Sequence, residues 1–118
     1  MTAQLAQLEM RGDGPVVVAA IAGEVDMSNA ADLGSAAANA LSVRTTALIL
    51  DLDRVTYLDS AAIHMIYELR AKLAGRGLKL ALVVPPEAPT FTALRLTGVP
   101  DAVPTFRTAD EARAELGD

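Results

Sequence analysis

Polar and apolar residues alternate at the start of this chain and then give way to longer apolar runs. From Ala6 to Met10 the alternation is strict, which is typical of a strand with one face in water. The apolar run from Val16 to Ile21 indicates a strand buried on both faces. Gly and Pro residues between Arg11 and Pro15 favour a turn. The chain is therefore predicted to open with a hairpin.

Apolar residues next recur at helical spacing. Gly23-Glu24-Val25-Asp26 links the hairpin to this helix, and Asp26 or Ser28 is expected to cap it. The predicted inward face consists of Ala30, Leu33, Ala37, Ala40 and Leu41.

A second predicted helix runs from Ser60 to about Ala74 and ends near Gly75. Its apolar face consists of Ala62, Ile66, Leu69 and Leu73, flanked by Ile63 and Met65. Ser60, His64 and Glu68 follow at four-residue spacing on the opposite face. We therefore expect Ser60 to be exposed at the helix start, where either Ser60 or Asp59 can provide the cap.

The remaining elements alternate between strands and helices. Strands are predicted at Ala47–Leu52, Leu78–Val84 and Val103–Phe106, and helices at Ala88–Thr97 and from Thr108 to about Leu116. The helix after the fourth strand is expected to turn Phe91, Leu94 and Leu96 inward. This order predicts an α/β fold with a mixed, mostly parallel sheet of about five strands and about four helices. We expect residues 1–118 to form a single domain.

Composition narrows the classes of function. The chain has no Cys, which excludes disulfides, thiolate catalysis and cysteine metal sites. Its net charge of −5 argues against nucleic acid as a direct partner, because phosphate binding needs clustered Lys and Arg. No segment has the pattern of a signal peptide, and no apolar run reaches the about 20 residues that cross a bilayer. These observations favour a cytoplasmic protein without membrane association.

The junction between the third strand and the second helix carries the most specific motif. Tyr57-Leu58-Asp59-Ser60-Ala61-Ala62-Ile63 resembles the Asp-Ser-x-Gly-Leu signature of STAS domains. Gly23-Glu24-Val25-Asp26 resembles the Gly-Glu-Leu-Asp that precedes the first helix in the anti-sigma factor antagonists of that family. The likeness covers nearly the whole chain. It departs at Ala62 and Ile63, where the family has Gly and Leu, and loss of the Gly makes this segment less permissive.

This resemblance implies a STAS fold and a non-catalytic regulator that switches between partners. The expected partner is an anti-sigma factor that is also a serine protein kinase of ATPase fold, so that binding frees a sigma factor and controls transcription. The resemblance implies phosphorylation at Ser60 and a phosphatase that reverses it, with no cofactor and no metal. The implied partner-binding residues are Asp26, Asp59, Ser60, Ala61 and His64. The free protein is expected to be a monomer.

Other functions stay open. STAS modules also serve in stressosomes and in lipid or anion transport. Asp51-Leu52-Asp53-Arg54-Val55 after an apolar strand matches the first motif of haloacid dehalogenase-type phosphatases. In that family the residue at Asp51 is the nucleophile, the residue at Asp53 is a general acid, and both help to hold Mg²⁺. However, no second acidic pair follows the strand Leu78–Val84. Ser60 and His64 could form a Ser–His dyad, but no third group is evident to orient the base.

Overall fold

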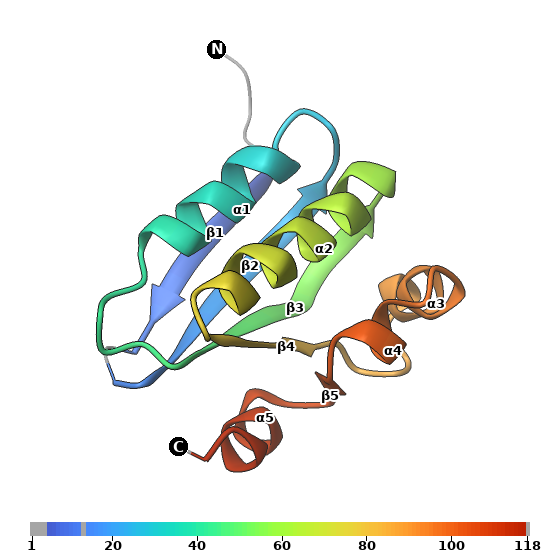
Figure 1. Ribbon diagram of the computed structural model, residues 1–118. Coiled ribbons are helices and arrows are strands. Elements are labelled where there is room, and N and C mark those ends of the chain that lie inside the picture. The colour runs from blue at the N-terminus through green and yellow to red at the C-terminus, as the bar shows by residue number, and fades with distance from the viewer. Residues whose placement is uncertain (1–4, 13, 118) are drawn as a thin grey trace.

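The computed structural model describes residues 5–12 and 14–117, so Asp13 of the predicted first turn lies outside the described residues. The spatial order of the strands in the sheet is the same as their order in the chain. The strands are β1 (Ala6–Arg11), β2 (Val16–Val25), β3 (Ala47–Leu58), β4 (Lys79–Val83) and β5 (Thr105–Phe106). The first pair is antiparallel and every later pair is parallel. The prediction of a mixed, mostly parallel sheet is therefore confirmed (Figure 1).

Helices cover both faces of this sheet. The helices α1 (Ala30–Asn39) and α2 (Ser60–Gly75) lie side by side on one face, and α5 (Ala109–Glu115) lies on the other (Figure 1). Two short helices, α3 (Pro89–Leu96) and α4 (Val99–Ala102), follow β4. The helix α4 was not predicted, because a single turn is too short to show a helical period. Within the described residues, no helix has both the length and the apolar character needed to cross a membrane.

The main core lies between the sheet and the helices α1 and α2. It consists of Ala, Val, Leu, Ile and Met side chains, as the absence of Trp and the scarcity of other aromatic residues require. The predicted inner face of α2 is confirmed, because each of its four apolar residues is at most 3% exposed. The predicted outer face is also confirmed, since Ser60, His64 and Glu68 are all exposed. The helix therefore anchors the core while presenting Ser60 to solvent.

The strand β3 is longer than predicted. The prediction ended it at Leu52 and treated the residues up to Asp59 as a link, whereas the strand continues to Leu58. It continues because its second half pairs with β2 as far as Val25. Two register shifts, each adding a residue to β3, interrupt this ladder. Such bulges break the alternation of polar and apolar residues by which a strand is recognised in a sequence.

Smaller differences lie at helix ends. Ala40 is the C-cap of α1 and is exposed rather than buried. Leu96 is the last residue of α3 and is 74% exposed, so the prediction that it faces inward is wrong. Gly75 is the last helical residue of α2, and Gly77 takes the left-handed conformation after it, with φ of 74°. In each case the predicted helical spacing was correct, but the helix ended at a different residue from the predicted one.

Candidate functional site

Asp59 connects the start of α2 to the turn before α1 at one end of the sheet. It is the N-cap of α2, and its Oδ1 accepts hydrogen bonds from the backbone N–H groups of Ala61 at 2.9 Å and Ala62 at 3.2 Å. Its Oδ2 accepts a third hydrogen bond, from the backbone N–H of Met27 at 3.2 Å. Met27 lies in the turn between β2 and α1, and Figure 1 shows that turn and the start of α2 at the same end of the sheet. One carboxylate thus holds both segments in place.

Ser60 is the first residue of α2 and not its cap. Both Ser60 and Asp59 were possible caps from their residue types, and the structure gives that position to Asp59. The side chain of Ser60 is exposed, and its hydroxyl makes no hydrogen bond to any residue that the structure describes. The hydroxyl is therefore accessible to a second molecule, while the backbone beside it is held by the cap.

Asp26 forms a tight turn instead of capping α1. Its Oδ1 accepts hydrogen bonds from the hydroxyl of Ser28 at 2.5 Å and from the Ser28 backbone N–H at 2.9 Å. The hydroxyl bond, and then the backbone bond, hold the pKa of Asp26 below its ordinary value. The N-cap position of α1 belongs to Asn29, so the prediction that Asp26 or Ser28 caps this helix is wrong. Asn29 closes the turn by accepting from the Asp26 backbone N–H and donating to the carbonyl of Glu24.

His64 and Ala61 are also near the start of α2. His64 lies one helical turn after Ser60 on the exposed face, and its Nε2 is 2.6 Å from Oε1 of Glu68. The imidazole therefore interacts with Glu68 and not with Ser60, which is the opposite of what a Ser–His dyad requires. Ala61 is half-buried and contributes chiefly its backbone N–H, which Asp59 accepts.

Two exposed hydrophobic residues near this site were missed in the sequence. Met27 is 84% exposed in the turn after β2, and Tyr57 is 50% exposed near the end of β3. Met and Tyr are enriched in protein interfaces, where they provide adaptable apolar contact area. The available signal was a large apolar residue within the otherwise polar Asp26–Asn29 turn. The hydrogen bond between Met27 and Asp59 could not be predicted, because the two residues are 32 positions apart in the sequence.

Ala62 occupies the position where the STAS signature has Gly. It lies within α2, it is 2% exposed, and no described residue other than Gly has a positive φ. The local backbone thus requires no glycine, and the Cβ of Ala62 packs in the core. The departure from the signature therefore has no cost in backbone strain.

Asp51 and Asp53 are not arranged as the phosphatase alternative expects. Both lie within β3 and not after its end, and Oδ1 of Asp51 accepts a hydrogen bond from the backbone N–H of Asp53 at 3.0 Å. In the part of the chain that the structure describes, no three His, Asp or Glu side chains are grouped so that they could hold a metal ion. The motif match therefore lacks its structural context.

Comparisons with known proteins identify the family of the domain. The family model for the STAS domain matches residues 7–112. The chain is similar to the crystal structure of an anti-sigma factor antagonist from Mycobacterium paratuberculosis, with 26% identity and a TM-score of 0.83 over 96% of this chain and 95% of that chain. No curated protein sequence matches significantly.

Two further structures share the fold at lower identity. The anti-sigma factor antagonist SpoIIAA in its unphosphorylated form has 18% identity and a TM-score of 0.66, over 93% of this chain and 94% of that chain. The Bacillus cell fate determinant SpoIIAA in its phosphorylated form has 17% identity and a TM-score of 0.68, over 93% of this chain and 99% of that chain.

Proposed function

This chain belongs to the STAS domain family, and on that premise we propose that it is an anti-sigma factor antagonist that works by partner switching. In this proposal residues 1–118 form one STAS domain without catalytic activity. Its unmodified form binds an anti-sigma factor that is a serine kinase of ATPase fold, which frees a sigma factor. Phosphorylation of Ser60 by that kinase ends the complex, and a phosphatase restores it.

The arrangement of Asp59 and Ser60 is the observation that carries this proposal. A protein kinase needs an accessible hydroxyl, and that of Ser60 is exposed on the first residue of α2. The backbone around it is fixed by the three hydrogen bonds that Asp59 accepts. A hydroxyl on a rigid support loses little conformational freedom when a kinase binds it, which favours modification at this position.

The surface around Ser60 suits a protein partner. The exposed apolar side chain of Met27 is accompanied by the polar residues Asp26, Asp59 and His64. Apolar anchors within a polar rim are the usual composition of a protein interface. We therefore propose that Asp26, Asp59, Ser60, Ala61 and His64 contact the partner, together with Met27.

Charge gives phosphorylation a direct way to release the partner. A phosphate adds a charge of about −1.5 to −2 at pH 7. The N–H groups of Ala61 and Ala62, which would otherwise stabilise an anion at this helix start, already donate to Asp59. The phosphate therefore stands beside a second negative charge with these donors occupied. Burying it in an interface costs more than the about 1.4 kcal/mol that lowers affinity tenfold.

A pull-down from a lysate of the source cells tests the proposal. The bait is wild-type protein, with Ser60→Ala and Ser60→Asp as variants of one position. We expect wild type and Ser60→Ala to retain a kinase of ATPase fold and Ser60→Asp to lose it. The purified kinase should then transfer phosphate from ATP to wild type and not to Ser60→Ala. Equal recovery by all three baits, or phosphorylation of the alanine variant, contradicts the proposal.

A further inference from the structure

The sheet face opposite α1 and α2 is covered by α5 over only part of its length. Beneath α5 the strands present apolar side chains, which form a small second core: Val16, Val18, Ala47, Ile49 and Val83, with Ala112 of the helix. Farther along the same face, β2 presents Ala20 and Ala22, and β3 presents Asp51 and Asp53. Each strand thus changes from apolar packing residues to small or charged residues at the point where α5 no longer covers the sheet.

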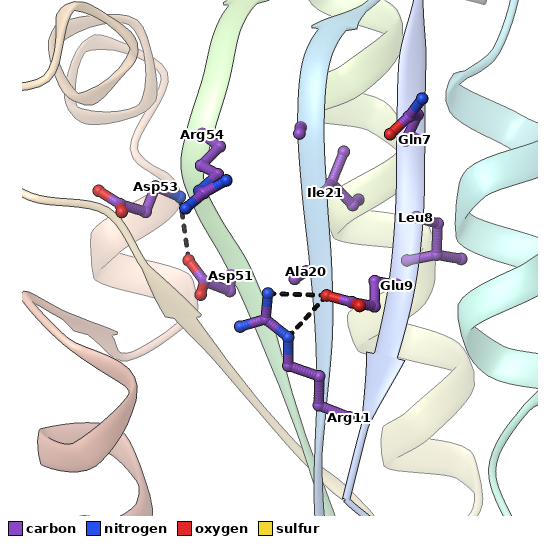
Figure 2. A pocket seen from close by; sticks show the side chains of 10 residues that line it. Gln7, Leu8, Glu9, Arg11, Ala20, Ile21, Asp51, Asp53 and Arg54 are labelled. Carbon is purple, nitrogen blue, oxygen red and sulfur yellow. Dashed lines mark hydrogen bonds and ion pairs between the residues drawn. The ribbon is translucent and has the colours of Figure 1, made fainter.

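Ala20, Ala22, Asp51 and Asp53 line a hollow of about 360 Å³, together with Arg54 and residues of β1. The alanines form a shallow floor, and charged side chains of β1 and β3 rise beside it, including Arg11, Asp51 and Arg54 (Figure 2). Its volume falls within the range of about 300–1,000 Å³ that is typical of small-molecule sites. Figure 2 shows Arg11, Asp51 and Arg54 in front of the sheet and the helices behind it, so the hollow lies on the face opposite α2 and is separate from the surface around Ser60.

A bulge in β3 directs Arg54 toward this hollow. Asp51 pairs with Ala20, but Arg54 pairs with Ala22, so β3 advances by one more residue than β2 between these points. In a regular strand Arg54 would point to the helix side, since successive side chains alternate between faces. The extra residue places Arg54 on the same face as Asp51. Bulges of this kind commonly re-aim a side chain next to a functional site.

The charges in the hollow are only partly compensated. Glu9 and Arg11 of β1 form an ion pair with each other at 2.7 Å (Figure 2). The carboxylate of Asp51 accepts only a backbone N–H from within the described residues, and Arg54 makes no hydrogen bond or ion pair with any of them. Three residues of extended strand separate the Cα atoms of Asp51 and Arg54 by up to about 10 Å. A complementary ligand therefore has one cation and one anion separated by several bonds.

We propose that this hollow binds a small linear zwitterion of the class of basic or ω-amino acids. The cationic end lies against Asp51, and the carboxylate pairs with Arg54, as guanidinium and carboxylate geometry favours. The alkyl chain between the two charges lies over Ala20 and Ala22, whose small side chains leave room for it. This inference does not depend on the proposed function, because none of its residues belongs to the Ser60 surface.

Backbone amide NMR shifts of the isotope-labelled full chain test this site. The probes are ε-aminocaproate and L-arginine, and caproate and n-hexylamine are the controls with a single charge. We expect saturable shifts at Ala20, Ala22 and Asp53 with the zwitterions, and about fivefold weaker binding of either control. Arg54→Gln, which changes an exposed side chain, and Asp51→Asn should each weaken zwitterion binding about fivefold.

Matched variants distinguish binding at this hollow from a nonspecific effect of the net charge of the protein. Arg95→Gln and Asp101→Asn remove the same charges from exposed positions on α3 and α4 and should leave binding unchanged. The proposal is overturned if the zwitterions give no saturable shift up to about 50 mM. It is overturned equally if the shifts lie outside the hollow, or if Arg54→Gln weakens binding no more than Arg95→Gln does.

Discussion

The carboxylate of Asp59 and the backbone N–H of Met27 are joined by a 3.2 Å hydrogen bond between residues that are 32 positions apart. The same carboxylate caps α2, so the start of that helix and the turn before α1 are held by one side chain. Any change in charge at Ser60 acts directly beside this connection.

Replacing Asp59 by Ala should destabilise the fold. The variant loses the N-cap and leaves the N–H groups of Ala61 and Ala62 without their partner, which costs about 1–2 kcal/mol. Urea unfolding measures the free energy. Asp101→Ala is the matched control, since that exposed carboxylate makes no hydrogen bond to a described residue, and it should change stability by less than about 0.5 kcal/mol. Equal losses in the two variants contradict this role of Asp59.

Ser60→Ala should leave stability nearly unchanged. The Ser60 hydroxyl caps nothing and Ala favours a helix, so the change in unfolding free energy should stay within about 0.5 kcal/mol. The variant should still bind the partner and should accept no phosphate from the cognate kinase. Chemical unfolding and a phosphorylation assay on the same preparation test both statements. A stability loss as large as that of Asp59→Ala would contradict this prediction and indicate that the Ser60 hydroxyl caps α2.

Phosphorylation of Ser60 should loosen the Met27 contact without unfolding the domain. Repulsion between the phosphate and Asp59 weakens the exposed hydrogen bond to Met27, although salt screens part of it. We expect faster amide hydrogen exchange at Met27, with unchanged protection across Val16–Val25 and Ala47–Leu58. Loss of protection along both strands would instead indicate a conformational mechanism of release.

Ser28→Ala should raise the pKa of Asp26. The hydroxyl of Ser28 is the main cause of the lowered pKa, and its removal leaves only the backbone bond. Because the folded pKa is depressed, the contribution of this turn to stability is present above about pH 4 and is lost as pH falls through the folded value. Carbon NMR titration of the Asp26 carboxyl measures the shift. Ser35→Ala, an exposed change on α1, should leave the titration of Asp26 unchanged.

Gly23→Ala should be strongly destabilising. Gly23 has φ of 102°, and a Cβ there would lie 2.2 Å from the carbonyl oxygen of Leu5. That oxygen accepts the Glu24 backbone N–H at 2.8 Å, so it cannot retreat without breaking the pairing. We expect a loss of at least about 2 kcal/mol. Gly75→Ala is the control, because a Cβ at this helical position meets no atom within 4 Å, and it should be neutral or slightly stabilising.

The sequence predicted those features that depend on local periodicity. The two faces of α2 follow from a 3.6-residue repeat that uninterrupted helical geometry preserves. The full length of β3 could not be predicted, since the bulge beside Asp53 and Arg54 breaks the two-residue repeat.

Contacts within the site were predictable only in part. The motif placed Asp59 and Ser60 at the start of α2, but both residue types make good caps, so sequence alone could not choose between them. The hydrogen bond from Met27 joins distant segments and depends on the tertiary fold. The hollow beside Arg54 depends on how far α5 extends over the sheet, which no local pattern encodes.

The identity between strand order and chain order has a consequence for synthesis. Each strand, once it leaves the ribosome, finds its partner already present as the current edge of the sheet. No strand has to wait for a distant segment or insert between two others, so loop closure stays short at every step. The domain can thus assemble from β1 toward α5 in the direction of translation, and the Asp59 contact with Met27 needs only segments that precede β4 in the chain.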